Sequence, residues 1–170
     1  MSTEENNPVV IPESGMNFGP FRPERLFYIE KSEAFQRLGS GYSTAEFICL
    51  DRQGRMCLVE AKTSISNPES AEDFRNNMQQ IEKKFTDSYQ LFLTCHLGRR
   101  SKRSMGDQIL HLDMASTQVR FMLVIKNHKK EWLIHINETL NRNMRKTLKM
   151  WNIDIRVLNE DGAKELGLVQ

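Results

Sequence analysis

Two residues of opposite charge end an apolar segment of the chain and could do chemistry there. Glu60 and Lys62 lie two residues apart in the segment 56–62, which is otherwise apolar. Because side chains alternate along a strand, both would project from the same face. Placing a carboxylate and an ammonium group at the end of an apolar row is costly unless something is gained there. The pair therefore indicates a candidate site.

A second acidic residue faces this pair if the segment forms a hairpin with the one before it. The apolar segment that begins at Glu46 precedes it, and residues 52–54 end in glycine, which is typical of a three-residue hairpin loop. Such a loop pairs Asp51 with Arg55. Counting five residues outward along each strand then places Glu46 opposite Glu60, whereas a shift of one residue would send Glu46 to the other face.

Two carboxylates directly across a strand pair repel each other, and a divalent cation between them would turn repulsion into binding. Mg²⁺ takes oxygen ligands and commonly uses one or two carboxylates together with substrate phosphates. Lys62 could then orient or deprotonate a water molecule, or stabilise charge on a phosphate. In the alternative interpretation, Glu60 and Lys62 form a solvated strand face and Glu46 only caps a strand.

The elements that must hold these side chains follow from hydrophobic periodicity. Phe74, Met78, Ile81 and Phe85, for example, recur at helical spacing. We expect a helix over 23–38, strands over 46–51 and 56–62, a helix over 67–98, a strand over 119–126, a helix over 130–151, a strand over 153–158 and a short helix near 162–166.

This order predicts an α/β fold with a mixed central sheet flanked by helices on both faces. The continuous apolar run 119–126 is typical of a central strand, and the alternating segment 153–158 of an edge strand. Proline and glycine interrupt residues 1–20, which we expect to be a flexible tail. Residues 21–170 would form a single domain.

With these elements in place, the hairpin resembles the signature of the PD-(D/E)XK nuclease superfamily. The shared features are an acid on the first strand, here Glu46, and Glu-x-Lys at the end of the second, here within residues 59–63. The expected element order over residues 23–158 is similar to that superfamily's restriction-endonuclease-like core. The first acid is usually Asp after Pro, whereas this chain has Glu46 after Ala45, and the Gln-x-x-x-Tyr motif of one nuclease branch is absent.

The resemblance implies an enzyme that uses Mg²⁺ or Mn²⁺ to hydrolyse phosphodiester bonds of nucleic acid, with DNA as the expected partner. It assigns metal ligation to Glu46 and Glu60 and a catalytic role to Lys62. Some members add an acid from the first helix, which Glu33 or Glu30 would supply. The alternative is a non-catalytic module on the same fold that binds nucleic acid or protein, as a homodimer for instance.

Two basic stretches add candidates for phosphate binding. The segment 99–103 carries four basic residues in five, and residues 126–149 carry seven Lys or Arg against two Glu. A solvated charged face explains such runs equally well. If they bind a nucleic-acid backbone, the residues we expect to do so are Arg99, Arg100, Lys102, Arg103, Lys126, Lys129 and Lys130.

Composition limits the remaining classes. The net charge of +2 gives no strong preference for a partner, and no apolar run reaches the length of a membrane span. The first residues lack the basic and apolar regions of a signal peptide, so we expect a cytoplasmic protein without a membrane partner. The three cysteines show no metal-binding spacing and are expected to be buried apolar residues.

Overall fold

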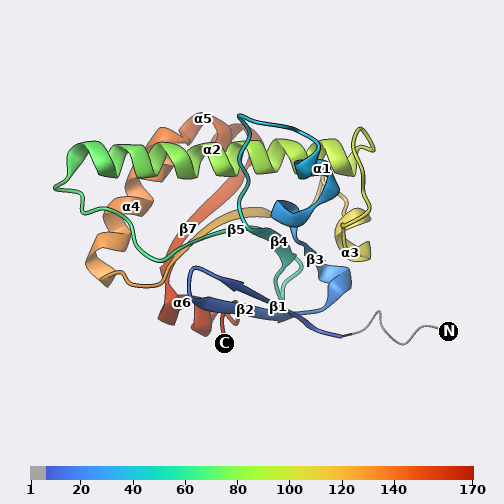
Figure 1. The fold of residues 1–170 in the computed structure, drawn as a ribbon, viewed down its shortest axis with the longest axis horizontal. Helices are drawn as coiled ribbons and strands as arrows, with labels where there is room; N and C mark the ends of the chain where they lie inside the picture. The colour runs from blue at the N-terminus through green and yellow to red at the C-terminus, as the bar shows by residue number, and fades with distance from the viewer. Residues whose placement is uncertain (1–6) are drawn as a thin grey trace.

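A five-stranded mixed sheet with the order β3-β4-β5-β6-β7 forms the centre of the protein (Figure 1). The computed structural model describes residues 7–170. The β3–β4 and β4–β5 pairs are antiparallel, whereas β5–β6 and β6–β7 are parallel. The predicted α/β fold with a mixed sheet is therefore confirmed. The strands are β3 (Leu26–Phe27), β4 (Phe47–Leu50), β5 (Met56–Lys62), β6 (Val119–Ile125) and β7 (Ile153–Asn159).

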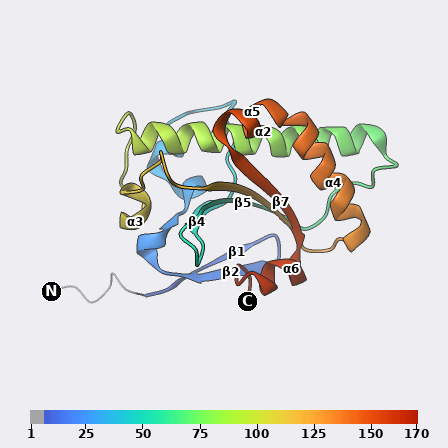
Figure 2. The same cartoon turned by 180° about the vertical axis from the view of Figure 1, so that it is seen from behind.

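Two layers cover the sheet, one on each face. Figure 2 shows α2 and α5 on one side of the sheet, and a two-stranded hairpin with α6 on the other. The first layer consists of α2 (Ala71–His96), α4 (Lys130–Asn143) and α5 (Arg145–Trp151). The second consists of β1 (Val9–Glu13), β2 (Met16–Phe21) and α6 (Glu160–Glu165). Short elements connect the layers: the 3₁₀ turns η1 (Pro23–Arg25) and η2 (Ile29–Lys31), and the helices α1 (Glu33–Gln36) and α3 (Asp107–Leu110).

The longest elements follow the apolar pattern of the sequence. The predicted stripe on α2 packs onto the sheet, with Phe85 stacked on Phe121 of β6 at 4.9 Å between ring centroids. Every residue of β6 is buried, as expected for a central strand. In β7 buried positions alternate with more exposed ones, and this strand lies at the edge of the sheet, as expected.

The flexible tail predicted over residues 1–20 is wrong from residue 9 onward, where the chain forms the β1–β2 hairpin; residues 1–6 lie outside the described part. Ser14 and Gly15 both have positive φ, 51° and 74°, which suits the tight turns that join two strands. Ile11 and Phe18 are completely buried against the sheet. Burial of these side chains offsets the entropy cost of ordering the segment.

Two predicted helices also differ from the structure. Only residues 33–36 of the expected helix over 23–38 are α-helical, because Leu26 and Phe27 pair with β4 instead. The expected helix over 130–151 is divided at Met144, whose backbone leaves the helical region and separates α4 from α5. Among residues 7–170, no helix combines the length and the apolar character that crossing a membrane would require.

Candidate functional site

The β4–β5 hairpin has the register that the sequence predicted. Phe47 pairs with Val59, as that register requires, but Glu46 lies just before β4 and its amide donates a hydrogen bond to the Val59 carbonyl at 3.0 Å, so the regular pairing does not extend to Glu46 and Glu60. The Asp51 amide donates a hydrogen bond to the Arg55 carbonyl at the turn, 3.0 Å away. Glu60 lies on the sheet face that packs against α2, and Glu46 approaches it from the open end of the hairpin, where both carboxylates contact Lys84 of α2.

Glu60 is completely buried, and a lysine of α2 neutralises it. The Lys84 Nζ lies 2.9 Å from the Glu60 Oε1 and donates a hydrogen bond to the Oε2 at 3.1 Å. Lys62 approaches the same Oε1 from the strand, at 3.3 Å. Lys84 is also 3.7 Å from the Glu46 Oε1, so its ammonium group lies between the two carboxylates. A lysine thus occupies the position where we had expected a metal ion.

Burial and mutual repulsion shift the ionisation of these groups. Burial raises the pKa of Glu60, and the attraction of Lys84 and Lys62 opposes that rise. Burial, followed by repulsion from Glu60, raises the pKa of Glu46 to about 8 even though Lys84 is close. Burial favours the neutral amine of Lys84, but the attraction of Glu60 and Glu46 outweighs it and raises its pKa. One ammonium group between two carboxylates therefore leaves Glu46 short of positive charge.

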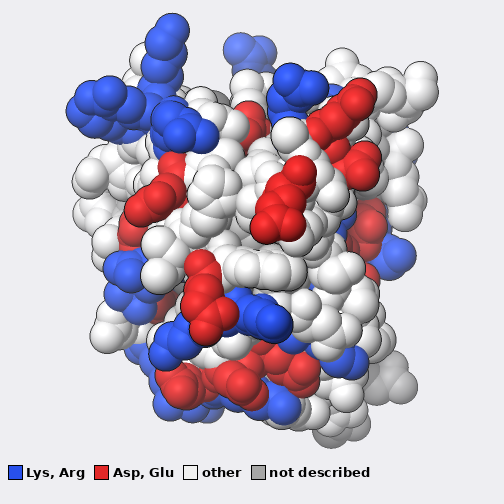
Figure 3. Space-filling model, turned by 90° about the vertical axis from the view of Figure 1, so that its left-hand side faces the viewer, with Lys and Arg blue, Asp and Glu red and all other residues white. Residues whose placement is uncertain are grey.

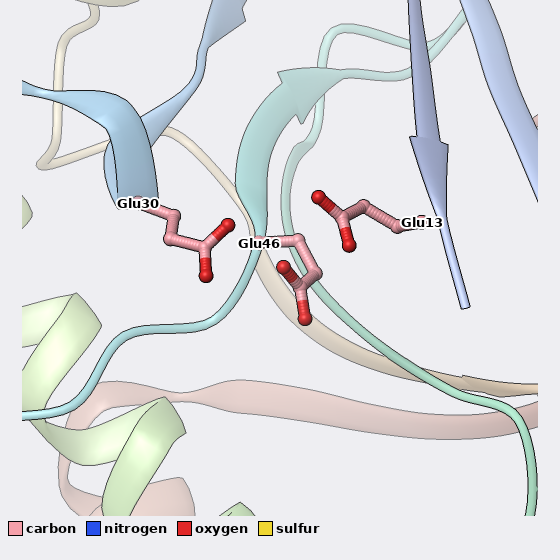
Figure 4. A group of neighbouring side chains, drawn as sticks. All are labelled: Glu13, Glu30 and Glu46. Atoms are coloured by element: carbon pink, nitrogen blue, oxygen red, sulfur yellow. The ribbon is translucent and has the colours of Figure 1, made fainter.

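Glu46 also belongs to a group of three carboxylates that come from separate elements (Figure 4). Glu13 comes from the end of β1, Glu30 from η2, and Glu46 from the residue before β4. One oxygen of each lies within 4.8 Å of the others. Oxygen donors at this spacing suit a hard divalent cation such as Mg²⁺ or Mn²⁺.

Specific contacts fix Glu13 in this group. The Tyr28 hydroxyl donates a hydrogen bond to the Glu13 Oε1 at 2.8 Å, and burial together with this bond raises the pKa of Tyr28. The turn after Glu13 is held at the ends of β5 and β6, where the Lys126 Nζ donates to the Gly15 carbonyl at 2.6 Å. The N-terminal hairpin is therefore part of the wall of the site.

Of the two acids expected from the first helix, the structure brings Glu30 to the group. Glu33 instead pairs with Arg37, at 2.5 Å, and accepts a hydrogen bond from the Ser101 hydroxyl at 2.9 Å. The predicted catalytic role of Glu33 has no support from this geometry, because both of its oxygens are engaged elsewhere.

The two basic stretches lie apart from each other. Arg99, Arg100, Lys102 and Arg103 follow the C-terminal end of α2, whereas Lys126, Lys129 and Lys130 lie where β6 leads into α4, at the other end of the molecule (Figure 1). A helix of the length of α2, 26 residues, spans about 39 Å. Figure 3 shows the side nearer to α4, where basic side chains are interspersed with acidic ones. The two basic stretches, 99–103 and 126–130, therefore do not form one continuous basic surface.

Sequence reasoning missed Glu13, Tyr28 and Lys84. Lys84 had a usable signal, because it lies three residues after Ile81 and four before Ser88, and both of these are buried on the sheet side of α2. A lysine within that stripe must meet a partner on the sheet. Glu13 had none, because its position depends on how the β1–β2 hairpin packs.

The described part of the chain thus combines a buried Glu–Lys pair with three converging carboxylates beside it. The three carboxylates could hold a metal ion while the lysines beside Glu60 contact a phosphate group. Alternatively, the buried Glu–Lys pair could only stabilise the fold. No protein-family model, curated protein or solved structure was found to match this chain, so its family is not identified by comparison.

Proposed function

We propose that this protein is a divalent-cation-dependent enzyme that hydrolyses phosphodiester bonds of nucleic acid. One observation carries the proposal: three carboxylates from separate elements converge beside a buried glutamate that holds two lysines. Carboxylates to hold the cation and lysines to meet a phosphate are the components that such chemistry needs. The Glu-x-Lys hairpin, similar to that of PD-(D/E)XK nucleases, supports the same conclusion.

The donor set fits Mg²⁺ or Mn²⁺. Glu13, Glu30 and Glu46 would hold the cation, and burial and repulsion from Glu60, which raise the pKa of Glu46 to about 8, are effects that a bound cation would offset. When bound, the cation supplies Lewis acidity toward a phosphoryl oxygen. This set shares Glu46 with the pair expected from the sequence, but Lys84 takes the place of a cation beside Glu60.

The remaining residues position the reacting groups. Glu60 anchors both lysines in the low-dielectric interior, where an ion pair holds its geometry firmly. Lys62, whose side chain is 30% exposed, can reach outward to a phosphate oxygen or hold the attacking water. Lys126, Lys129 and Lys130, beyond the ends of β5 and β6, are the basic residues best located to bind a strand of DNA that enters this site.

The first test is calorimetric titration with Mn²⁺ at pH 8.5. We expect one site in the wild type and at least about a tenfold loss of affinity in Glu46→Gln, since a carboxylate ligand is lost. Glu33→Gln is the matched control, because Glu33 lies outside the group, and it should bind like the wild type. Equal Mn²⁺ binding in all three proteins would refute the proposed ligand set.

The second test is cleavage of plasmid DNA and of single-stranded oligonucleotides in Mg²⁺ or Mn²⁺. Lys62→Ala should lose cleavage while it retains Mn²⁺ binding, because Lys62 is not a ligand. If the wild type binds Mn²⁺ but cuts no nucleic acid under any of these conditions, the enzymatic proposal fails and only a cation site remains.

A second function is favoured by Lys84 itself. Because its ammonium group already lies between Glu46 and Glu60, it reduces the repulsion between these two carboxylates without a metal. In that case the protein is a non-catalytic module that binds nucleic acid or a second copy of itself. Absence of Mn²⁺ binding both with and without DNA, together with retained DNA binding or a stable dimer, would favour this function.

A further inference from the structure

A cleft lies at the ends of β4 and β5 that point away from the carboxylate group. It has a volume of about 730 Å³ and is bounded by the end of β2, the β4–β5 turn and the segment that follows α6. The five residue steps from Glu46 to Asp51 correspond to about 16 Å along a strand, so the cleft and the carboxylates are separate sites. The volume is within the range of small-molecule sites.

Three arginines line this cleft: Arg22, Arg25 and Arg52. Among the described residues, neither Arg25 nor Arg52 pairs with a carboxylate, and Arg22 approaches Glu24 only to 3.9 Å. Arg25 donates instead to the backbone carbonyl of Asp51 at 2.5 Å, which fixes its guanidinium group in the wall.

The Arg52 guanidinium group extends over the backbone of Gly167. A Cβ added at Gly167 would lie 3.0 Å from the Arg52 Nη2, and φ at this residue is +72°. Glycine therefore leaves room for the arginine at the mouth of the cleft. The side chain is exposed, so its charge is available to a ligand.

The acid in the wall does not cancel this positive charge. The Asp51 carboxylate pairs with the Arg55 Nε at 2.6 Å and accepts hydrogen bonds from the Gln53 and Arg55 amides at 2.9 and 3.0 Å. It is fully engaged within the β4–β5 turn. The cleft consequently keeps an excess of positive charge on guanidinium groups, which bind phosphate oxygens in a bidentate manner.

The other walls are apolar. Phe21, Leu50 and Leu168 line the cleft beside the arginines. A ligand that fits both parts carries a phosphate group and a flat, weakly polar ring. We infer that this cleft binds the phosphate monoester of a nucleotide, either as a free mononucleotide or as the phosphorylated end of a strand.

The test is calorimetric titration with AMP at low salt and without divalent cations, beside titration with adenosine. We expect AMP to bind at least about tenfold more tightly than adenosine, a difference of about 1.4 kcal/mol. Arg52→Glu should lower AMP affinity by at least about tenfold, since it reverses one charge in the cleft. Both Arg52 and the residue changed in the control, Arg75→Glu on α2, are exposed, so neither change should prevent folding, and the control should bind AMP like the wild type.

A 5′-phosphorylated tetranucleotide distinguishes the two sources of the phosphate. Tighter binding of the tetranucleotide than of AMP, lost in Arg52→Glu, assigns the cleft to a strand end; tighter binding of AMP assigns it to a free nucleotide. No AMP or tetranucleotide binding at millimolar concentration, equal affinity for AMP and adenosine, or an unchanged Arg52→Glu variant would overturn the inference. None of these results depends on cleavage activity, so this inference and the proposed function fail separately.

Discussion

Replacing Lys84 by methionine should destabilise the protein strongly and in a pH-dependent way. Methionine fills similar space but removes the group that lies 2.9 and 3.1 Å from the two oxygens of Glu60, which has no exposed surface. Only Lys62, at 3.3 Å and partly exposed, would remain. Breaking a buried pair by removing one partner costs about 3–5 kcal/mol. That is a large share of the roughly 5–15 kcal/mol by which native domains are stable.

The pH dependence has a definite sign. The pKa of Glu60 is already raised in the folded protein, and loss of Lys84 removes the main attraction that opposes the rise. A raised carboxyl pKa means that the folded state retains a proton which the unfolded state releases, so stability falls as pH rises toward the folded pKa. The loss of stability in Lys84→Met should be small near pH 5 and should approach its full size near pH 9.

Urea unfolding followed by circular dichroism at pH 5, 7 and 9 measures this effect. Lys83→Met is the matched control: Lys83 is the preceding residue of α2, it pairs with Asp87 on the surface, and its replacement should cost no more than about 0.5 kcal/mol at any of these pH values. Adding Glu60→Gln to Lys84→Met should recover much of the loss at pH 9. A cost for Lys84→Met that is below about 1 kcal/mol, or that is the same at pH 5 and 9, would refute the description of Glu60 as a buried ion-pair partner.

Three further results are expected. Because the pKa of Glu46 rises from 4.5 to about 8 on folding, stability should fall by up to about 1.4 kcal/mol per pH unit between these values. In urea titrations, Glu46→Gln should flatten that slope, and a slope that persists in the variant would assign it to another group. Glu13→Gln should weaken Mn²⁺ binding in calorimetry by at least about tenfold while the melting temperature changes little, since an amide oxygen can still accept the Tyr28 bond; unchanged affinity would exclude Glu13 as a ligand. Phe18→Ala removes a completely buried ring that packs edge-on against Phe47 at 5.3 Å, so urea unfolding should show a loss of about 3–5 kcal/mol, and a loss below 1 kcal/mol would mean that the β1–β2 hairpin is only loosely attached.

Local pattern was sufficient to predict the β4–β5 hairpin and its register. A three-residue loop ending in glycine leaves few ways to pair its flanking strands, and apolar alternation selects one of them. That is why the proximity of Glu46 to Glu60 could be predicted, although the Glu46 amide bonds to the Val59 carbonyl and does not continue the regular pairing. The buried strand β6 and the edge strand β7 were also predicted correctly from local pattern. A continuous apolar run indicates a strand buried on both faces, and alternation indicates a strand buried on one face.

The rest of the candidate site depends on packing between distant segments. Glu13 reaches Glu46 only because Ile11 and Phe18 pack the β1–β2 hairpin onto the sheet. The sequence of this hairpin, with short strands and several proline and glycine residues, is typical of a flexible tail when it is considered alone. Leu26 and Phe27 leave the helical pattern because β4 offers them strand partners. The pairing of Lys84 with Glu60 combines a helix and a strand whose relative rotation is set by the whole core. Local propensity gives way in each case to tertiary contacts.

The order of these segments along the chain has a consequence for folding. Lys84 lies 24 residues after Glu60, so the β4–β5 hairpin emerges from the ribosome before the lysine that neutralises Glu60 emerges. A hairpin that closes before α2 docks brings Glu46 near Glu60 with only Lys62 as a counter-charge, and repulsion between the carboxylates opposes its closure. The parallel partner β6 is synthesised later still, which also delays this part of the sheet. Docking of α2 brings Lys84 to both carboxylates, so closure of the hairpin and packing of the helix favour each other.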